Sequence, residues 1–223
     1  MGKIFSNYWE FIAKRKEFGG VKRPVLYWYP PIPGEKMNEV ERVYFDFIKD
    51  VPCLLDFGAG DLSLKKRFEA AGFKGKWLTC DLSKEFNYDF TTIDEVIASG
   101  TKVDAVLVLE VIEHMTLPEF EDFVPKLKKI LNPNGKIILS TPNATAVNAV
   151  WSGDYTHVKT YPLQDLWAIF SLIGFDCIPY RVVWTVARPT LWNWIELQIN
   201  RVLTHFLGLD YANGVALLCK GRS

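Results

Sequence analysis

The stretch L-L-D-F-G-A-G-D-L-S, residues 54–63, decides the fold. Its apolar start predicts a short buried strand, and F-G-A-G ends that strand in a glycine turn. Apolar residues at helical spacing follow as far as Gly72, which is typical of a helix and its end. Glycines in such a turn let the backbone come close to a ligand, with the N-terminus of the helix directed at it. The stretch therefore predicts a strand, a ligand-binding turn and a helix.

The chain beyond this stretch repeats the alternation of strands and helices. Strands are predicted at residues 76–81, 88–90, 103–109, 136–141, 175–186 and 215–219, and helices at 117–131, 162–173 and 190–207. Continuously apolar strands that alternate with helices indicate an α/β fold, with a largely parallel sheet covered on both faces. In such sheets a ligand binds beyond the carboxyl ends of the strands, next to the first strand.

The first fifty residues do not follow this pattern. Residues 1–50 are therefore predicted to be an appendage to a domain of residues 51–223. The segment contains the run L-Y-W-Y-P-P-I-P-G at 26–34 and a predicted helix at 35–49. Neighbouring aromatic residues and prolines predict a stiff loop at 26–34. This loop either packs over the edge of the sheet or lines and covers a substrate pocket.

Composition restricts the class of protein. The 223 residues suffice for one α/β domain, and 49% hydrophobic with 23% charged residues is a globular composition. Lys plus Arg and Asp plus Glu both number 26, and the zero net charge argues against nucleic acid as a partner. Four widely spaced cysteines in predicted strands indicate reduced thiols and a cytoplasmic protein. We find no signal peptide and no apolar run near the roughly 18 residues of a transmembrane segment.

An acidic residue ends the second predicted strand. Asp81 follows Gly60 by 21 residues, and a carboxylate at this position can accept hydrogen bonds from both hydroxyls of a ribose. The ligand is therefore expected to contain an adenosine-like ribose. Two classes of cofactor share this arrangement, but a dinucleotide site has a third glycine where this chain has Ser63.

From about residue 51 to residue 220 the chain resembles the class I S-adenosylmethionine-dependent methyltransferases. The matching pieces, in the order of the family, are L-D-F-G-A-G, the strand that ends in Asp81, D-F at 89–90, L-E-V-I-E-H, L-N-P-N-G-K-I-I-L-S-T-P-N, H-V-K-T-Y-P-L-Q-D-L and I-G-F. The resemblance implies a Rossmann-like, doubly wound sheet of seven mainly parallel strands, with helices on both faces and an antiparallel last strand. It also implies S-adenosyl-L-methionine as the cofactor.

The resemblance also assigns residues to parts of the cofactor. It implies that the loop of Gly58, Ala59 and Gly60 binds the amino-acid end, Asp81 the ribose, Asp89 the adenine amino group and Leu82 or Phe90 the adenine face, with Asp56 and Glu110 completing the set. One departure is visible, because the helix that usually follows the second strand has shrunk to L-S-K-E-F-N-Y. Asp89 is therefore alternatively a turn residue.

The stretch V-L-V-L-E-V-I-E-H-M, residues 106–115, ends a predicted strand in ionisable side chains. If the chain makes a helical turn there, Glu110, Glu113 and His114 share one face, and His157 follows the fifth strand on the same rim. Three interpretations are open. The residues merely place polar side chains in water at a strand end, His114 or His157 takes the proton from an acceptor hydroxyl, or all four residues hold a divalent metal ion. We assign His114 and His157 as catalytic residues and none as a metal ligand, although the E-x-x-E-H pattern resembles metal-dependent relatives.

The acceptor is expected to be a hydroxyl group of a small molecule or a glycan. E-H after the fourth strand accompanies hydroxyl acceptors in the relatives that it resembles, and the N-P-P-Y and D-P-P-Y signatures of amino-group methyltransferases do not occur. A metal-dependent RNA 3′-terminal 2′-O-methyltransferase, a non-catalytic binding subunit and a nicotinamide-dependent oxidoreductase are the alternatives. The apolar stripe of the helix at 190–207 indicates packing on the sheet, a homodimer face or a lid.

Overall fold

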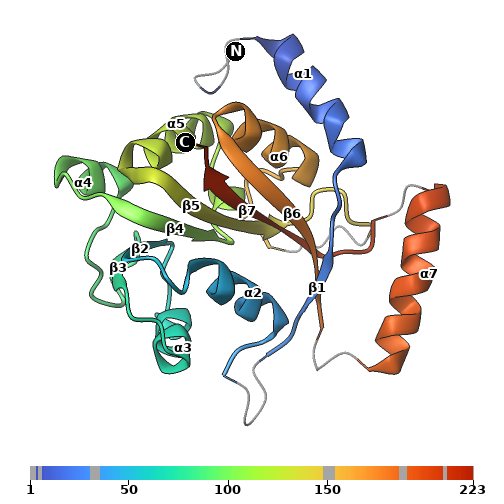
Figure 1. Ribbon diagram of the computed structural model, residues 1–223, viewed down its shortest axis with the longest axis horizontal. Helices are drawn as coiled ribbons and strands as arrows, with labels where there is room; N and C mark the ends of the chain where they lie inside the picture. Colours follow the sequence, from blue (N-terminus) through green and yellow to red (C-terminus); the bar gives the residue numbers. More distant parts are fainter. Residues whose placement is uncertain are drawn as a thin grey trace.

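A seven-stranded sheet forms the centre of the computed structural model, which describes residues 4, 7–30, 36–147, 154–185, 190–207 and 210–222 (Figure 1). Its strands are β1 (Val25–Trp28), β2 (Cys53–Phe57), β3 (Lys76–Cys80), β4 (Val103–Leu109), β5 (Leu131–Pro142), β6 (Phe175–Trp184) and β7 (Gly214–Gly221). They lie in the order β1-β6-β7-β5-β4-β2-β3. β7 is antiparallel to β5 and β6, and the other pairs are parallel. The predicted α/β fold with an antiparallel last strand is confirmed.

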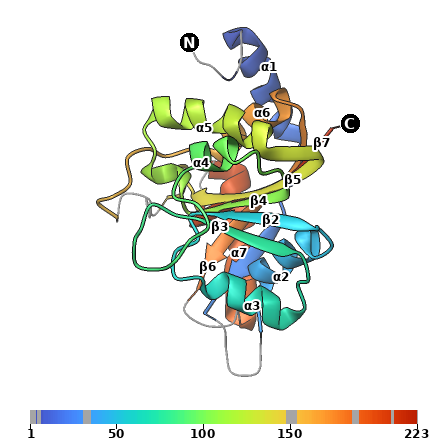
Figure 2. The same cartoon turned by 90° about the vertical axis from the view of Figure 1, so that its left-hand side faces the viewer.

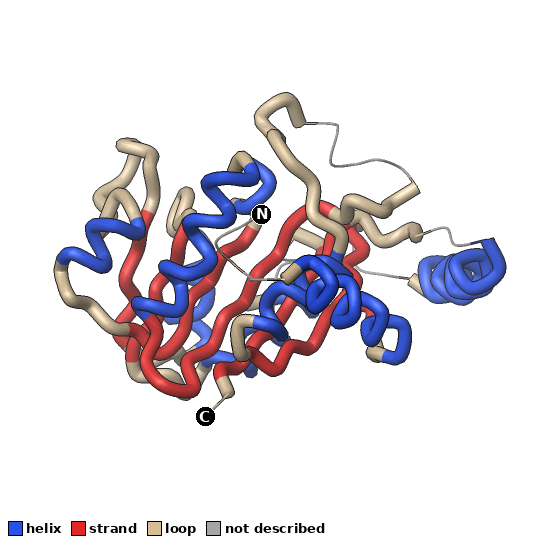
Figure 3. Tube along the Cα trace, turned by 90° about the horizontal axis from the view of Figure 1, so that it is seen from above, coloured by secondary structure: helices blue, strands red, loops and turns tan. Residues whose placement is uncertain are grey.

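Helices cover both faces of the sheet (Figure 2). α2 (Glu39–Ile48) and α3 (Ser63–Ala71) lie on one face, and α4 (Ile93–Ala98), α5 (Leu117–Ile130) and α6 (Leu163–Leu172) lie on the other. Two hydrophobic cores correspond to the two faces, one around Phe68 and the other around Phe120. α1 (Tyr8–Glu17) is joined to α6 by an ion pair of 2.6 Å between Arg15 and Asp165. α7 (Leu191–Leu207) stands apart from the sheet at one end of the molecule (Figure 3).

Two of the helices, α2 and α5, begin at residues whose side chains cap them. Asn38 precedes α2 and accepts a hydrogen bond from the backbone N–H of Glu41, whose side chain accepts one from the N–H of Asn38. Thr116 and Glu119 form the same reciprocal pair before α5. Such capping boxes satisfy N–H groups that have no partner within the helix. None of the described helices has the length and apolar composition needed to cross a membrane.

The edges of the sheet differ from the prediction. Residues 26–34 were expected to form a loop, but Val25–Trp28 pairs with β6 as an edge strand, and residues 31–35 lie outside the described part. The strand expected at 88–90 is reduced to one bridge between Cys80 and Phe90. The connection after β3 is too short to carry a strand and the helix that would precede it. β1 at the opposite edge therefore supplies the seventh strand.

Two of the cysteines are also placed differently from the expectation of reduced thiols. Cys177 and Cys219 lie directly opposite each other on the antiparallel strands β6 and β7, with Cα atoms 4.2 Å apart, and form a disulfide. Cys53 and Cys80 are free thiols. The prediction was wrong for the pair because sequence spacing does not reveal which residues of two strands face each other.

Candidate functional site

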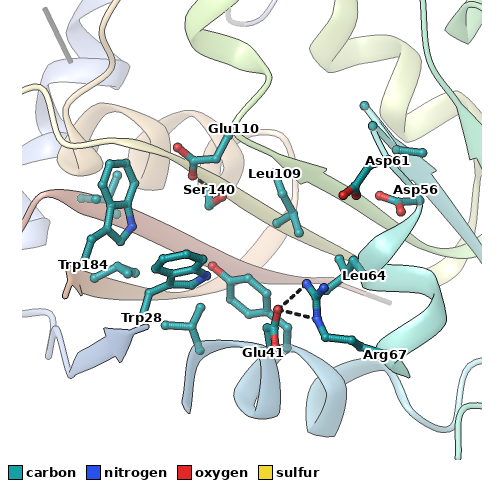
Figure 4. Close-up of a pocket in the computed structure, with 18 residues that line it drawn as sticks. Trp28, Glu41, Asp56, Asp61, Leu64, Arg67, Leu109, Glu110, Ser140 and Trp184 are labelled. Atoms are coloured by element: carbon teal, nitrogen blue, oxygen red, sulfur yellow. Dashed lines mark hydrogen bonds and ion pairs between the residues drawn. The ribbon is translucent and has the colours of Figure 1, made fainter. Parts of the chain in front are cut away.

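Two cavities open at the carboxyl edge of the sheet. The first, here called the α2-side cavity, has a volume of about 510 Å³ and lies between the sheet, α2 and α3 (Figure 4). The second, the α5-side cavity, has a volume of about 540 Å³ and lies between the loop after β3 and α5. Both volumes lie in the range of small-molecule sites. Gly58 and Glu110 line both cavities, so the two meet at these residues.

The predicted glycine turn forms the floor between the two cavities. Gly58 has a φ of 81°, and a Cβ atom added to it would lie 2.4 Å from Cγ2 of Val111. Gly60 has a φ of 49°, and its N–H donates a hydrogen bond of 2.9 Å to Oδ2 of Asp81. The N–H groups of Gly58 and Ala59 donate to the carbonyl oxygen of Cys80. Only glycine fits at residue 58 without strain, and the turn is tied to the end of β3.

The structure separates the residues predicted to bind adenosine into two groups. Asp81 and Leu82 line the α5-side cavity, and Leu82 is 76% exposed. Asp89 and Phe90 line neither cavity. Oδ2 of Asp89 accepts hydrogen bonds of 2.9 Å from the N–H and the hydroxyl of Thr79, and so fastens the loop to β3.

Glu110 does not begin the helical turn that the sequence analysis assumed. Its φ is 54°, a left-handed value that is uncommon for a side-chain-bearing residue. Only a single 3-10 turn, η2 (Ile112–His114), follows. The hydroxyl of Ser140 donates a hydrogen bond of 2.6 Å to Oε1 of Glu110. Burial and the nearby Glu113 raise the pKa of Glu110 to about 8.

The other three residues of the predicted set lie close together, and Glu113 also lies beside Glu110. Ligand atoms of Glu113, His114 and His157 all lie within 4.8 Å of one another. Glu113 is 1% exposed, and burial raises the pKa of its carboxyl. The hydroxyl of Thr141 donates to its Oε2, whereas Oε1 is buried without a hydrogen-bond partner. Such an orphaned oxygen is costly and marks a place where a cation or a proton fits.

The geometry around His114 fixes the position of its ring proton. Nδ1 lies 3.2 Å from the carbonyl oxygen of Thr156 and 3.1 Å from its hydroxyl oxygen. The carbonyl can only accept, and the hydroxyl already donates to Asp154 at 2.7 Å. In the neutral imidazole Nδ1 therefore carries the hydrogen, and Nε2 has the lone pair that could take a proton or bind a metal ion.

The α2-side cavity contains residues that the sequence analysis did not assign to the site. They are Trp28 at the end of β1, Glu41 and Tyr44 of α2, Arg67 of α3, Ser140 of β5 and Trp184 of β6. Trp28 belongs to the aromatic run at 26–34, whose alternative interpretation placed it at a pocket. Nothing local marks the others, since they meet only when the sheet forms. Asp56 is also buried here, and burial raises its pKa to about 7.

Comparisons with known sequences identify the family of the chain. A family model described as a methyltransferase domain matches residues 33–180. The ubiquinone biosynthesis O-methyltransferase of a Cereibacter sphaeroides strain is 26% identical over 133 residues, which is 52% of this chain and 52% of that protein. The mitochondrial ubiquinone biosynthesis O-methyltransferase of Arabidopsis thaliana is 41% identical over 64 residues, 29% of this chain and 19% of that protein. The chain spans about half the length of the Cereibacter relatives that it matches.

Solved structures share the fold. A SAM dependent methyltransferase from Archaeoglobus fulgidus superposes with a TM-score of 0.64 at 18% identity, covering 81% of this chain and 92% of the other. Magnesium protoporphyrin IX methyltransferase from Synechocystis PCC 6803, solved with bound SAH, has a TM-score of 0.52 at 16% identity, covering 82% and 80%. The family match extends over most of the sheet, from α2 to β6. The chain therefore belongs to the methyltransferase-domain family, and it shares its fold with the solved SAM dependent methyltransferase.

Proposed function

We propose that the protein uses S-adenosyl-L-methionine to methylate a hydroxyl group of a small molecule or a glycan. The observation that carries this proposal is the meeting of two cavities at Gly58 and Glu110, beside a histidine with a free Nε2 lone pair. One cavity can hold the cofactor and the other the acceptor. The names of the ubiquinone biosynthesis O-methyltransferases support oxygen as the acceptor atom.

The residues present fit the cofactor. Asp81 has carboxylate oxygens at the mouth of the α5-side cavity for the ribose hydroxyls, and the exposed Leu82 offers an apolar surface for the adenine. The turn at Gly58 and Gly60 would hold the amino-acid end, since no side chain there blocks the approach. When bound, the cofactor supplies an activated methyl group on a positively charged sulfur. The carboxyl of Asp56 is buried beside the turn and, when ionised, would complement that positive charge.

The chain itself would position the acceptor and remove its proton. His114 is the proposed base, because Nε2 has the lone pair and Thr156 holds the ring in that tautomer. His157 lies next to it, with ring centroids 4.9 Å apart, and can take the same role. The rest of the rate enhancement would come from orientation of the two reactants.

A divalent ion at Glu113, His114 and His157 is the second candidate for activating the hydroxyl. The observation in its favour is the buried Oε1 of Glu113, which has no partner, within a set of carboxylate and imidazole donors. A bound ion would lower the pKa of a coordinated hydroxyl and replace the base. The distinguishing variant is Glu113→Gln, with the exposed Glu69→Gln as the control. A calorimetric heat of manganese binding that is lost in Glu113→Gln and kept in Glu69→Gln would establish the ion site. If the wild type shows no heat of manganese binding, the histidine base is the remaining candidate for activating the hydroxyl.

The first experiment is to titrate S-adenosylhomocysteine into the protein by calorimetry. We expect micromolar binding that Asp81→Ala weakens at least tenfold, because the ribose loses two charge-assisted hydrogen bonds. Asp46→Ala, an exposed carboxylate of α2, is the control and should bind like the wild type. Absence of binding by folded wild-type protein would refute the proposal and favour the non-catalytic subunit or, if NAD binds, the oxidoreductase.

Three further features belong to the proposal. β1 and α2, both from residues 1–50, line the α2-side cavity and support a role of this segment in acceptor binding. The exposed Trp192 and Trp194 of α7 are consistent with the homodimer face, which Trp192→Asp and sedimentation would test; Leu209 of the apolar stripe lies outside the described residues. A cytoplasmic location and an acceptor other than RNA remain predictions from composition, to be tested by fractionation and by methyl transfer to RNA.

A further inference from the structure

Two tryptophans stand side by side at the open end of the α2-side cavity. Trp28 ends β1 and Trp184 ends β6, and the two residues are partners in the parallel register. Partners in parallel strands point to the same face of a sheet, about 4.8 Å apart. Figure 4 shows both indoles directed into the cavity that also contains Glu110 and Ser140. Both side chains line one side of it.

Backbone hydrogen bonds fix the positions of both residues, and the indole of Trp184 is also packed against β7. A Cβ atom on Gly214 would lie 3.1 Å from three atoms of the Trp184 ring, so this indole rests directly on the backbone of β7. The backbone N–H of Trp184 donates a hydrogen bond to Oδ1 of Asn213. The carbonyl oxygen of Trp28 accepts from the N–H of Thr185 at 2.8 Å. Trp28 nevertheless remains 37% exposed, which leaves part of a rigid ring available for contact.

The charges of the cavity restrict what can lie against this surface. Arg67 is the only basic residue among the described residues that line it, and its Nε and Nη2 both donate to Oε1 of Glu41, at 3.0 and 2.6 Å. Asp56, Asp61 and Glu110 are acidic. A negatively charged acceptor would therefore meet the carboxylate of Asp61, whose pKa is lowered by hydrogen bonds from Ser63, and would find no free cation among the described lining residues.

We infer that Trp28 and Trp184 form the wall that selects the acceptor, and that the acceptor is an uncharged molecule with a flat ring face. The inference rests on the proposed function, since the same cavity must open toward the cofactor at Gly58 and Glu110. A ring that lies along the two indoles would direct a hydroxyl substituent toward that junction. β1 is thus a specificity element supplied by the N-terminal segment.

The test uses protein saturated with S-adenosylhomocysteine and three probes, catechol, methyl glucoside and 3,4-dihydroxybenzoate, each titrated by calorimetry. At least one of the two neutral rings should bind, and the carboxylated ring should bind at least tenfold more weakly than catechol. Trp28→Ala should weaken the neutral probe about tenfold, whereas Trp28→Phe should retain most of the affinity. Trp9→Ala, an exposed indole outside the cavity, should change nothing.

A second variant tests the wall without removing a ring. Gly214→Ala should displace the indole of Trp184 and weaken the neutral probe, with unchanged binding of S-adenosylhomocysteine. Probe binding that is equal in wild type, Trp28→Ala and Gly214→Ala would overturn the inference, as would tighter binding of the carboxylated ring or no binding of either neutral ring. If the wild type fails to bind S-adenosylhomocysteine, the proposed function falls and this inference falls with it.

Discussion

Replacement of Gly58 by alanine should destabilise the protein by about 2–5 kcal/mol. The residue has a φ of 81°, and a left-handed conformation costs a residue with a Cβ about 1–2 kcal/mol. The new Cβ would also lie 2.4 Å from Cγ2 of Val111, and overpacking of this kind costs about 1–3 kcal/mol. The two costs add because they have different origins, one in the backbone and one in packing.

Gly60→Ala is the matched control. Gly60 also has a positive φ, of 49°, but nothing lies within 4 Å of its added Cβ. The free energy of unfolding of this variant should therefore fall only by the cost of the left-handed backbone conformation, about 1–2 kcal/mol. The reduced freedom of alanine in the unfolded chain is the same in both variants and cancels in the comparison.

Urea unfolding measures the backbone cost and the packing cost separately. It is applied to the wild type, to both alanine variants, to Val111→Ala and to the double variant Gly58→Ala with Val111→Ala. The double-mutant cycle should show a favourable coupling of about 1–3 kcal/mol, because a smaller residue 111 removes the clash and leaves the backbone strain. Equal losses for Gly58→Ala and Gly60→Ala, or no rescue by Val111→Ala, would refute the claim that close packing at this junction requires glycine.

Burial raises the pKa of Asp56 in the folded protein to about 7. The free energy of unfolding of the wild type should therefore fall by up to about 4 kcal/mol as the pH rises from about 4 to 7, because only the unfolded state loses this proton readily. Asp56→Asn has no such proton to lose and should stabilise the protein above pH 7. Urea unfolding at pH 5 and pH 8 tests this, and an unchanged pH dependence in the variant would contradict it. Asp89→Ala should cost about 1–3 kcal/mol through the lost bonds to Thr79, yet leave binding of S-adenosylhomocysteine unchanged; a large loss of binding in folded protein would restore the predicted adenine contact. Cys177 and Cys219 are 42 residues apart, so reduction of their disulfide should lower the free energy of unfolding by about 4 kcal/mol. Thiol titration in denaturant without reductant checks that the bond is present, and four reactive cysteines would show that it does not form.

The central part of the fold was predictable because its signals are local. The apolar run that ends in F-G-A-G and the helix that ends at Gly72 are each readable within a few residues, and β2, the turn and α3 follow them. The hydrogen bond from Gly60 to Asp81 could be anticipated as well, because parallel neighbouring strands bring their carboxyl ends to one edge. Helix starts such as Asn38 also depend only on near neighbours.

The remaining features depend on pairings between distant parts of the chain. The partner of β1 is β6, and no pattern within residues 26–34 identifies it. The opposition of Cys177 and Cys219 is a matter of register in the same way. At Glu110 a single left-handed residue interrupts the helical turn that the spacing assumed, and its carboxyl accepts a hydrogen bond from Ser140 of β5 while still lying beside Glu113. The position of the tryptophan wall could not be predicted for the same reason, since Trp28 and Trp184 become neighbours only through the pairing of β1 with β6.

The attachment of β1 also has a consequence for the synthesis of the protein. The hydroxyl of Thr185 bonds to the carbonyl oxygen of Trp28 across 157 residues of chain. On a ribosome, β1 emerges early but cannot dock until β6 has emerged, and β6 needs β7 beside it to join the sheet. Its aromatic residues therefore stay accessible to chaperones and proteases for most of translation. We expect the nascent chain to be protected from proteolysis around residue 28 only after its last strand is released.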